Sequence, residues 1–87
     1  MKITILPRAE KELRRLPKFD QIAIAQKIRL LPSPSLTGEE KLSGYARVFR
    51  VRVGNYRIVY KKINEEIVII LIGNRKDIYR MLASILR

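Results

Sequence analysis

The pattern of apolar and polar positions near the N-terminus predicts a short strand followed by a helix. Lys2–Leu6 is rich in β-branched residues and stops at Pro7, a residue that suits the first turn of a helix. The apolar positions that follow recur at spacings of four and three, and they are Ala9, Leu13 and Leu16. Charged residues lie between them, so one stripe of this helix should be buried before Pro17 ends it.

A second helix is predicted from about Lys18 to Leu31, where few positions are polar. Its apolar residues leave only a narrow polar edge, and they are Phe19, Ile22, Ala23, Ile24, Ala25, Ile28 and Leu31. We expect the two helices to form a hairpin with a shared apolar face. A loop follows at Pro32 and Pro34, since proline cannot continue a helix, and it extends through Thr37-Gly38.

From Tyr45 onward the period changes to two, which indicates strands. The first of these strands alternates apolar residues with arginines, in the order Phe49, Arg50, Val51, Arg52 and Val53. Gly54-Asn55 supplies a tight hairpin turn, and Tyr56–Ile63 runs back. After a further turn at Asn64-Glu65, Glu66–Ile72 is a nearly continuous apolar strand, as expected inside a sheet that is covered on much of both faces.

A last helix is predicted over Lys76–Leu86, with Asp77 near its positive N-terminal end. Its apolar residues again recur at spacings of four and three, and they are Ile78, Leu82 and Ile85. The predicted fold is therefore α+β: an N-terminal strand, a helical hairpin, a three-stranded antiparallel meander that completes one sheet, and a C-terminal helix. The length of 87 residues is enough for one domain, which we assign to residues 1–87.

The predicted hairpin separates its side chains onto two faces. With a turn at Gly54-Asn55, Arg52 faces Arg57 and Arg50 faces Val59 across the ladder. One face should lie on the core side, and it carries Phe49, Val51, Val53, Tyr56, Ile58 and Tyr60. The opposite face gathers Arg50, Arg52 and Arg57.

That arginine face predicts a phosphate-binding site. Like charges directly opposite in a sheet are destabilising, so Arg52 beside Arg57 lowers stability unless an anion lies among them. Guanidinium groups suit bidentate contact with phosphate. The alternative is a solvated strand face on which the arginine stems cover apolar surface.

The segment from Gly73 to Tyr79 places two further residues near this face. Arg75 lies where the last strand becomes the last helix, so its side chain can reach back over the sheet. Tyr79 is about one helical turn further on and can project towards the same place. The alternative for Tyr79 is a packed helix aromatic with its hydroxyl at the rim.

The composition adds a strong positive charge. Nineteen Lys and Arg against 8 Asp and Glu give a net charge of +11, which favours a nucleic-acid partner. The sequence has no Cys and no His, so disulfides, structural zinc sites and imidazole acid/base chemistry are excluded. No stretch approaches the roughly 20 apolar residues of a membrane span, so we expect a cytoplasmic protein without a membrane partner.

Taken in order, these segments resemble the RelE/ParE superfamily of toxins over nearly the whole chain. The resemblance is carried by Ala9–Leu13, Lys41–Gly44, Phe49–Tyr60 and Gly73–Tyr79. The arginine-rich hairpin followed by the terminal arginine and tyrosine is its most specific part. The resemblance implies a RelE-like fold and a type II toxin that is restrained by an acidic antitoxin, whose helical segment packs on the sheet or displaces the last helix.

RelE toxins enter the ribosomal A site and cleave mRNA there, by attack of a ribose 2′-hydroxyl on the neighbouring phosphate, without a metal or other cofactor. The resemblance therefore implies an mRNA endoribonuclease whose partners are the ribosome with its mRNA. At the family's functional positions this sequence has Arg50, Arg52, Arg57, Arg75 and Tyr79. The resemblance implies that these residues are catalytic.

One departure from the family pattern affects the mechanism. Better-known RelE sequences carry lysines where Arg50 and Arg52 stand, and arginine, unlike lysine, effectively cannot exchange a proton. Tyr79 is then the expected base, since nearby guanidinium groups make a phenol more acidic. Arg57 and Arg75 would neutralise charge on the phosphorane. No residue is assigned to protonate the leaving oxygen.

Two other functions are compatible with the sequence. A ParE-like inhibitor of DNA gyrase would share the fold and the charge without needing the arginine cluster. A non-catalytic module that binds RNA or the ribosome would use the arginines only as phosphate contacts. Arg75 together with Tyr79 favours the RelE reading over the gyrase inhibitor.

Overall fold

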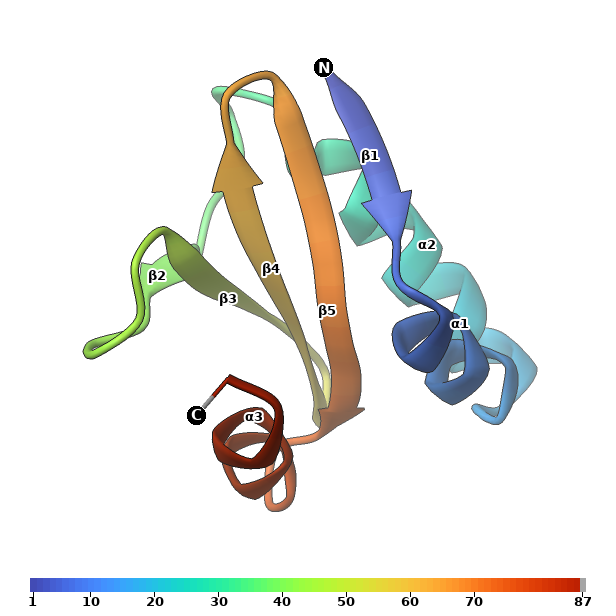
Figure 1. The fold of residues 1–87 in the computed structure, drawn as a ribbon. Coiled ribbons are helices and arrows are strands. Elements are labelled where there is room, and N and C mark those ends of the chain that lie inside the picture. Colours follow the sequence, from blue (N-terminus) through green and yellow to red (C-terminus); the bar gives the residue numbers. More distant parts are fainter. Residues whose placement is uncertain (87) are drawn as a thin grey trace.

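The computed structural model describes residues 1–86, in which helices pack on both faces of one sheet (Figure 1). The strands are β1 (Lys2–Ile5), β2 (Glu40–Lys41), β3 (Val48–Val53), β4 (Tyr56–Ile63) and β5 (Glu66–Asn74). The helices are α1 (Pro7–Arg14), α2 (Lys18–Leu30) and α3 (Ile78–Leu86). Within this described part of the chain, no helix is long and apolar enough to cross a membrane. The predicted α+β class is confirmed.

The sheet has the strand order β1-β5-β4-β3-β2. The N-terminal strand β1 runs parallel to β5, and the remaining pairs are antiparallel. Gly54 has φ +59°, a left-handed backbone conformation that the tight turn between β3 and β4 requires and that glycine adopts at little cost. The predicted register of the hairpin is confirmed, because Arg52 pairs with Arg57 and Arg50 with Val59.

The short strand β2 is a correction to the sequence analysis, which assigned no strand between residues 32 and 44. Glu40 pairs with Arg50 and Lys41 with Phe49, so β2 adds an edge to the sheet beside β3. Two residues are too few to show a period of two, so the alternation of apolar and polar positions could not reveal this strand.

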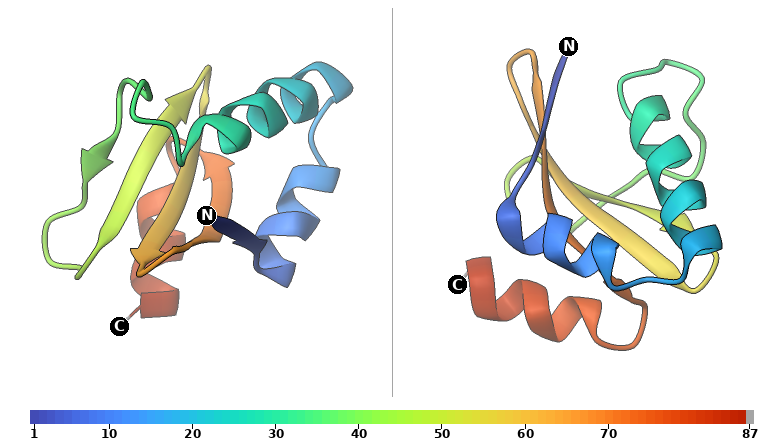
Figure 2. Two further views of the ribbon diagram at one scale, coloured as in Figure 1. Left: turned by 90° about the horizontal axis from the view of Figure 1, so that it is seen from above. Right: turned by 90° about the vertical axis from the view of Figure 1, so that its right-hand side faces the viewer.

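The larger core lies between the sheet and the helical hairpin of α1 and α2, on one face of the sheet (Figure 2). Its buried members are Ala9, Ile24, Ile28, Leu31, Val51, Ile58, Tyr60, Ile67, Ile69 and Ile72. Phe49, Val53 and Tyr56 pack against it with partial burial. The predicted core side of the β3–β4 hairpin is therefore confirmed.

A smaller core lies on the opposite face, beneath α3. Its buried members are Val48, Val59, Ile70, Leu71, Ile78 and Leu82. The pairing of β4 with β5 shifts between Val59 and Tyr60, so Ile70 is an extra residue on β5. Because of this bulge, the consecutive residues Ile70 and Leu71 both belong to the smaller core, while Ile69 and Ile72 belong to the larger one. The face that carries the arginines is thus partly apolar, a division that strict alternation does not predict.

The prediction for the second helix is wrong at its outer positions, where apolar residues are exposed. Ile24, Ile28 and Leu31 are buried, whereas Phe19 is 88% exposed and Ile22 and Leu30 are each 47% exposed. The helix has more apolar residues than one contact stripe against the sheet can cover. Ile22 and Leu30 lie three and eleven residues after Phe19, so the three residues form an exposed apolar stripe along α2.

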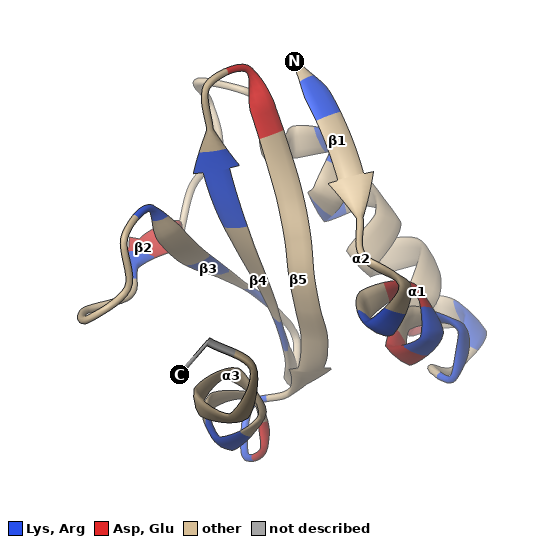
Figure 3. Cartoon of the chain, in the orientation of Figure 1, with Lys and Arg blue, Asp and Glu red and all other residues tan. Residues whose placement is uncertain are grey.

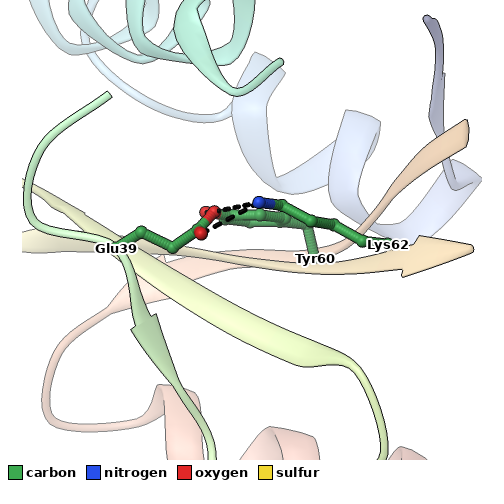
Figure 4. Close-up of polar contacts among 3 residues, drawn as sticks. All are labelled: Glu39, Tyr60 and Lys62. Carbon is green, nitrogen blue, oxygen red and sulfur yellow. Dashed lines mark hydrogen bonds and ion pairs between the residues drawn. The ribbon is translucent and has the colours of Figure 1, made fainter. Parts of the chain in front are cut away.

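A polar clamp holds the segment before β2 against the sheet (Figure 4). The hydroxyl of Tyr60, which is fully buried, donates a hydrogen bond to the carboxylate of Glu39. The ammonium of Lys62 lies 2.9 Å from the same carboxylate. Burial first, and then the hydrogen bond and the negative charge of Glu39, raise the pKa of Tyr60 above its ordinary value of 10.0. We call Glu39, Tyr60 and Lys62 the Glu39 clamp.

Replacing Tyr60 by Phe should lower the free energy of unfolding by about 1–2 kcal/mol at neutral pH, because a hydrogen bond to a charged acceptor is lost while the ring stays. The loss should be at the lower end if Lys62 compensates for the missing donor. Urea denaturation of the parent and the Tyr60→Phe variant measures this difference.

The difference in stability between the parent and the Tyr60→Phe variant should depend on pH in the alkaline range. The folded-state pKa of Tyr60 is raised, so its contribution to stability is fully present below about pH 10 and is lost as the pH rises further, since only the unfolded tyrosine then ionises. The difference in stability between parent and variant should therefore narrow above pH 10, by up to about 1.4 kcal/mol per pH unit. A constant difference from pH 8 to pH 11 would contradict the buried hydrogen bond.

Candidate functional site: an arginine cluster beside a helix tyrosine

Three arginines lie on one face of the β3–β4 hairpin. Arg50 and Arg52 alternate along β3 with Val51 and Val53, which pack in the larger core, so their side chains point to the opposite face. Arg57 faces Arg52 directly across the ladder. Figure 3 shows basic segments along β3 and β4 and around the turn that leads into α3. The predicted grouping of these arginines on one face is thus present in the structure.

The turn after β5 brings Arg75 to the same end of the hairpin. The backbone N–H of Arg75 donates a hydrogen bond of 3.0 Å to the carbonyl oxygen of Asn55, in the hairpin turn. The side-chain oxygen of Asn74 accepts a hydrogen bond of 2.8 Å from the backbone N–H of Lys76. These two contacts fix the chain where it leaves the sheet, so the backbone of Arg75 is tied to the strands that carry the other arginines.

The start of α3 packs closely against the sheet. Gly73 is buried, and a Cβ atom at this position would lie 3.1 Å from the Cδ1 atom of Ile78. The missing side chain lets α3 approach the end of β5, while Ile78 and Leu82 anchor the helix in the smaller core. The exposed side of the helix then carries Tyr79 towards β3.

Tyr79 joins the arginine cluster through Arg50. The Cζ atom of Arg50 lies 5.3 Å from the centroid of the Tyr79 ring, a cation–π distance. Tyr79 is 41% exposed, so its ring is held by the arginine while part of the side chain remains open to solvent. We call Arg50, Arg52, Arg57, Arg75 and Tyr79 the arginine cluster.

The charges of the neighbouring arginines act on Arg57. Partial burial lowers the pKa of the Arg57 guanidinium, and the charges of Arg52, Arg50 and Arg75 lower it further. Glu40 acts in the opposite direction and raises this pKa. A lowered pKa means that the charged form of Arg57 is destabilised in the folded protein, so an anion bound among these residues would be stabilised.

Glu40 is a member of this site that the sequence analysis missed. Its carboxylate lies 3.4 Å from the Arg50 guanidinium, because β2 places Glu40 opposite Arg50. No pattern marks Glu39-Glu40 as part of a strand, so only the folded sheet brings this acid to the arginines.

The chemistry available at this site is that of anion binding. The guanidinium groups offer many N–H donors on a rigid sheet, and the tyrosine adds a hydroxyl. Among residues 1–86, no three acidic, histidine or cysteine side chains gather in a way that could hold a metal ion.

Comparison with known proteins agrees with this architecture. Solved structures similar to this chain include the RelB–RelE antitoxin–toxin complex from Methanococcus jannaschii, with a TM-score of 0.75 and 28% identity over 90% of this chain and 96% of that chain. The isolated RelE toxin of E. coli has a TM-score of 0.71 and 25% identity over 99% of this chain and 98% of that chain. The RelE–RelB complex from Pyrococcus horikoshii has a TM-score of 0.71 and 26% identity over 85% of this chain and 93% of that chain.

Sequence comparison points the same way. A search among curated proteins finds no significant match. The family profile described as "ParE toxin of type II toxin-antitoxin system, parDE" matches residues 3–79, which include the hairpin, the last strand and the first residues of α3. With this match over most of its length and a fold shared with RelE toxins, the chain belongs to the ParE toxin family within the RelE/ParE superfamily, and it is a toxin of a type II toxin-antitoxin system.

Proposed function

We propose that residues 1–87 form one toxin domain that acts in the cytoplasm as an mRNA endoribonuclease, cleaving mRNA in the A site of the ribosome. The observation that carries the proposal is the contact between Arg50 and Tyr79, 5.3 Å from guanidinium carbon to ring centroid. It joins the one hydroxyl-bearing side chain of the proposed site to the arginines that would hold the RNA phosphate.

The arginines supply binding and charge stabilisation in this proposal. Arg50 and Arg52 remain protonated, so they hold the RNA backbone and exchange no proton. Arg57 and Arg75 neutralise the negative charge that develops on the phosphorane, as preorganised cations do at other phosphoryl centres. The rigid hairpin supports this role, because the core residues between the arginines fix their spacing.

Tyr79 is the proposed base. Its phenolate accepts the proton of the ribose 2′-hydroxyl as the O2′–P bond forms and the bond from phosphorus to the 5′-oxygen breaks, which leaves a 2′,3′-cyclic phosphate and a 5′-hydroxyl. The guanidinium of Arg50 places a positive charge beside the ring of this tyrosine. The leaving oxygen takes its proton from a group that we do not assign.

A second candidate function has its own support. The matching family profile carries the ParE name, which favours a ParE-like inhibitor of DNA gyrase. A non-catalytic binder of RNA or the ribosome is the third possibility. One assay separates them: purified ribosomes with bound mRNA are cut by an endoribonuclease and blocked without cutting by a binder, whereas a gyrase inhibitor leaves the mRNA intact and changes DNA supercoiling.

Replacing Tyr79 by Phe should slow single-turnover cleavage of ribosome-bound mRNA by roughly 10²- to 10⁴-fold, the usual contribution of a general acid or base. Binding to the ribosome should change little, because the ring and its contact with Arg50 remain. The matched control is Tyr56→Phe, which also removes a phenolic hydroxyl, but on the opposite face of the sheet. If the Tyr79 variant cleaves at the parent rate, this residue is not the base.

Replacing Arg52 by Thr should leave folding unharmed or improve it by up to roughly 1 kcal/mol, because the repulsion from Arg57 is relieved. Binding of a single-stranded RNA should weaken and become less sensitive to salt, since one phosphate contact is lost. Arg29→Gln, which removes the same charge from an exposed position of α2, is the control for net charge. A clear drop in the melting temperature of the Arg52 variant would mean that this arginine is structural.

We propose that the toxin is restrained by an acidic antitoxin encoded beside it. Solved complexes of RelE toxins with RelB antitoxins among the similar structures support a partner of this kind. For this partner we propose a contact surface on α2, in place of the sheet or the position of the last helix that the family resemblance implies. The exposed apolar stripe of α2 fits an amphipathic helix with acidic flanks, because the exposed basic residues Lys18 and Arg29 border it. Co-expression with the neighbouring open reading frame should give a tight complex that weakens with salt.

The contact on α2 has its own test. Phe19→Ser removes the most exposed aromatic of the stripe and should weaken the complex about tenfold or more, as expected when a buried aromatic side chain is lost from an interface. Ile63→Ser changes a similarly apolar, exposed residue at the end of β4 and should have little effect. Equal weakening by both variants would place the antitoxin elsewhere, and the absence of any complex would contradict the acidic partner itself.

A further inference from the structure

An acidic residue lies within a cluster whose charge is otherwise positive. The carboxylate of Glu40 and the guanidinium of Arg50 are 3.4 Å apart, with side chains that are 66% and 27% exposed. Of the ion pairs formed within residues 1–86, this is the one that involves the arginine cluster, since the others pair Arg14 with Glu10, Lys62 with Glu39 and Arg80 with Asp77. Within the described residues, Glu40 is therefore the acidic residue that forms an ion pair with the arginine cluster.

The backbone around Glu40 holds its carboxylate at this place. Glu40 pairs with Arg50 in the ladder, and the N–H of Leu42 donates a hydrogen bond of 2.8 Å to the carbonyl oxygen of Val48. On the other side, the preceding residue Glu39 is fixed by Tyr60 and Lys62 in the Glu39 clamp (Figure 4). Glu40 is thus presented to the arginines from a strand that is attached at both ends.

The charge of Glu40 also extends to the next arginine. Glu40 raises the pKa of Arg57, while burial and the surrounding arginines lower it. In the protein without a bound anion, this carboxylate offsets part of the repulsion that three arginines on one sheet face produce. An incoming phosphate would approach the guanidinium of Arg50, which is the group that pairs with this carboxylate.

We propose that Glu40 is the internal counterion of the arginine cluster, and that an RNA phosphate displaces it from Arg50 when RNA binds. The proposal rests on the proposed function, in which this cluster holds the RNA backbone. A carboxylate and a phosphate compete for the same guanidinium donors, and an exposed ion pair is weak enough to be exchanged. Glu40 then lowers the affinity for a lone phosphate and favours a strand that contacts several arginines at once.

The test compares Glu40→Gln with Glu10→Gln. Both variants remove one negative charge and one surface ion pair, but Glu10 lies on α1 and pairs with Arg14. The probe is a short single-stranded RNA in which a 2′-O-methyl group at every position prevents cleavage, and fluorescence anisotropy gives its Kd over a series of salt concentrations. Circular dichroism and thermal melting establish that both variants are folded.

The inference predicts that Glu40→Gln tightens RNA binding about two- to fivefold, the range set by the strength of an exposed ion pair, with Glu10→Gln showing a smaller change. The salt dependence should steepen in Glu40→Gln alone, because Arg50 then meets the phosphate without an internal partner. Glu40→Asp, whose shorter side chain keeps the charge but reaches less far, should lie between the parent and the Gln variant.

Three results would overturn the inference, and unchanged RNA binding in Glu40→Gln is the first. An equal gain in both Gln variants would mean that net charge alone governs affinity, and weaker binding in Glu40→Gln would mean that the carboxylate contacts the RNA itself or holds Arg50 in its binding position. The Arg52→Thr variant keeps this failure distinct from failure of the proposed function. If Arg52→Thr binds the probe as tightly as the parent, the cluster is not the RNA site; if it binds more weakly while the Glu40 variant is unchanged, only the counterion role fails.

Discussion

Val53 and Tyr56 face each other across the turn at Gly54 and Asn55, and this pairing fixes the position of every residue in the central hairpin. Side chains alternate between the faces of a strand, so a slip by one residue would turn the arginines of β3 into the core and its valines into solvent. The larger core excludes that arrangement because it buries Val51 and Ile58 completely or almost so. Apolar packing on one face thus enforces the crowding of charge on the other.

The crowding has an energetic consequence that the sheet can tolerate. Directly opposed arginines destabilise a ladder by an amount on the order of 1 kcal/mol or less, while each fully buried Ile or Val side chain stabilises the fold by about 1.5–3 kcal/mol. Buried residues on both faces of β4 and β5 outnumber the repelling pair, so apolar burial outweighs the repulsion and maintains the register of the hairpin. The pair of Arg50 and Glu40 relieves the repulsion further without closing the site, since Glu40 remains mostly exposed.

Much of this hairpin could be predicted from the sequence because the relevant patterns are local. Alternation of valine with arginine gave the two faces of β3, and Gly54-Asn55 gave the turn and therefore the register. Arg75 and Tyr79 could be assigned to the site only through their order in the chain and the family resemblance. The contact between Arg50 and Tyr79 depends on how α3 docks, which is decided by the absence of a side chain at Gly73 and by burial of Ile78 and Leu82.

Other features depend on tertiary structure in ways that no local pattern carries. The strand at Glu40 exists only because β3 offers it a free edge, so its acid could not be assigned to the site. The bulge at Ile70 places two consecutive apolar residues on one face, whereas the sequence shows only a continuous apolar run. The sequence shows which residues of α2 are apolar. It does not show which of them face the sheet, because nearly every face of that helix is apolar.

The helix α3 links stability to the proposed chemistry. Ile78 and Leu82 cover the smaller core, and Tyr79, between them in sequence, contacts Arg50 from the exposed side of the same helix. Any movement of α3 away from the sheet would therefore expose Val59 and Leu71 to water and remove the tyrosine from the arginines in one step. Since burial of those apolar residues opposes such a movement, the same contacts that complete the fold also hold the tyrosine at the distance from Arg50 on which the proposed proton transfer depends.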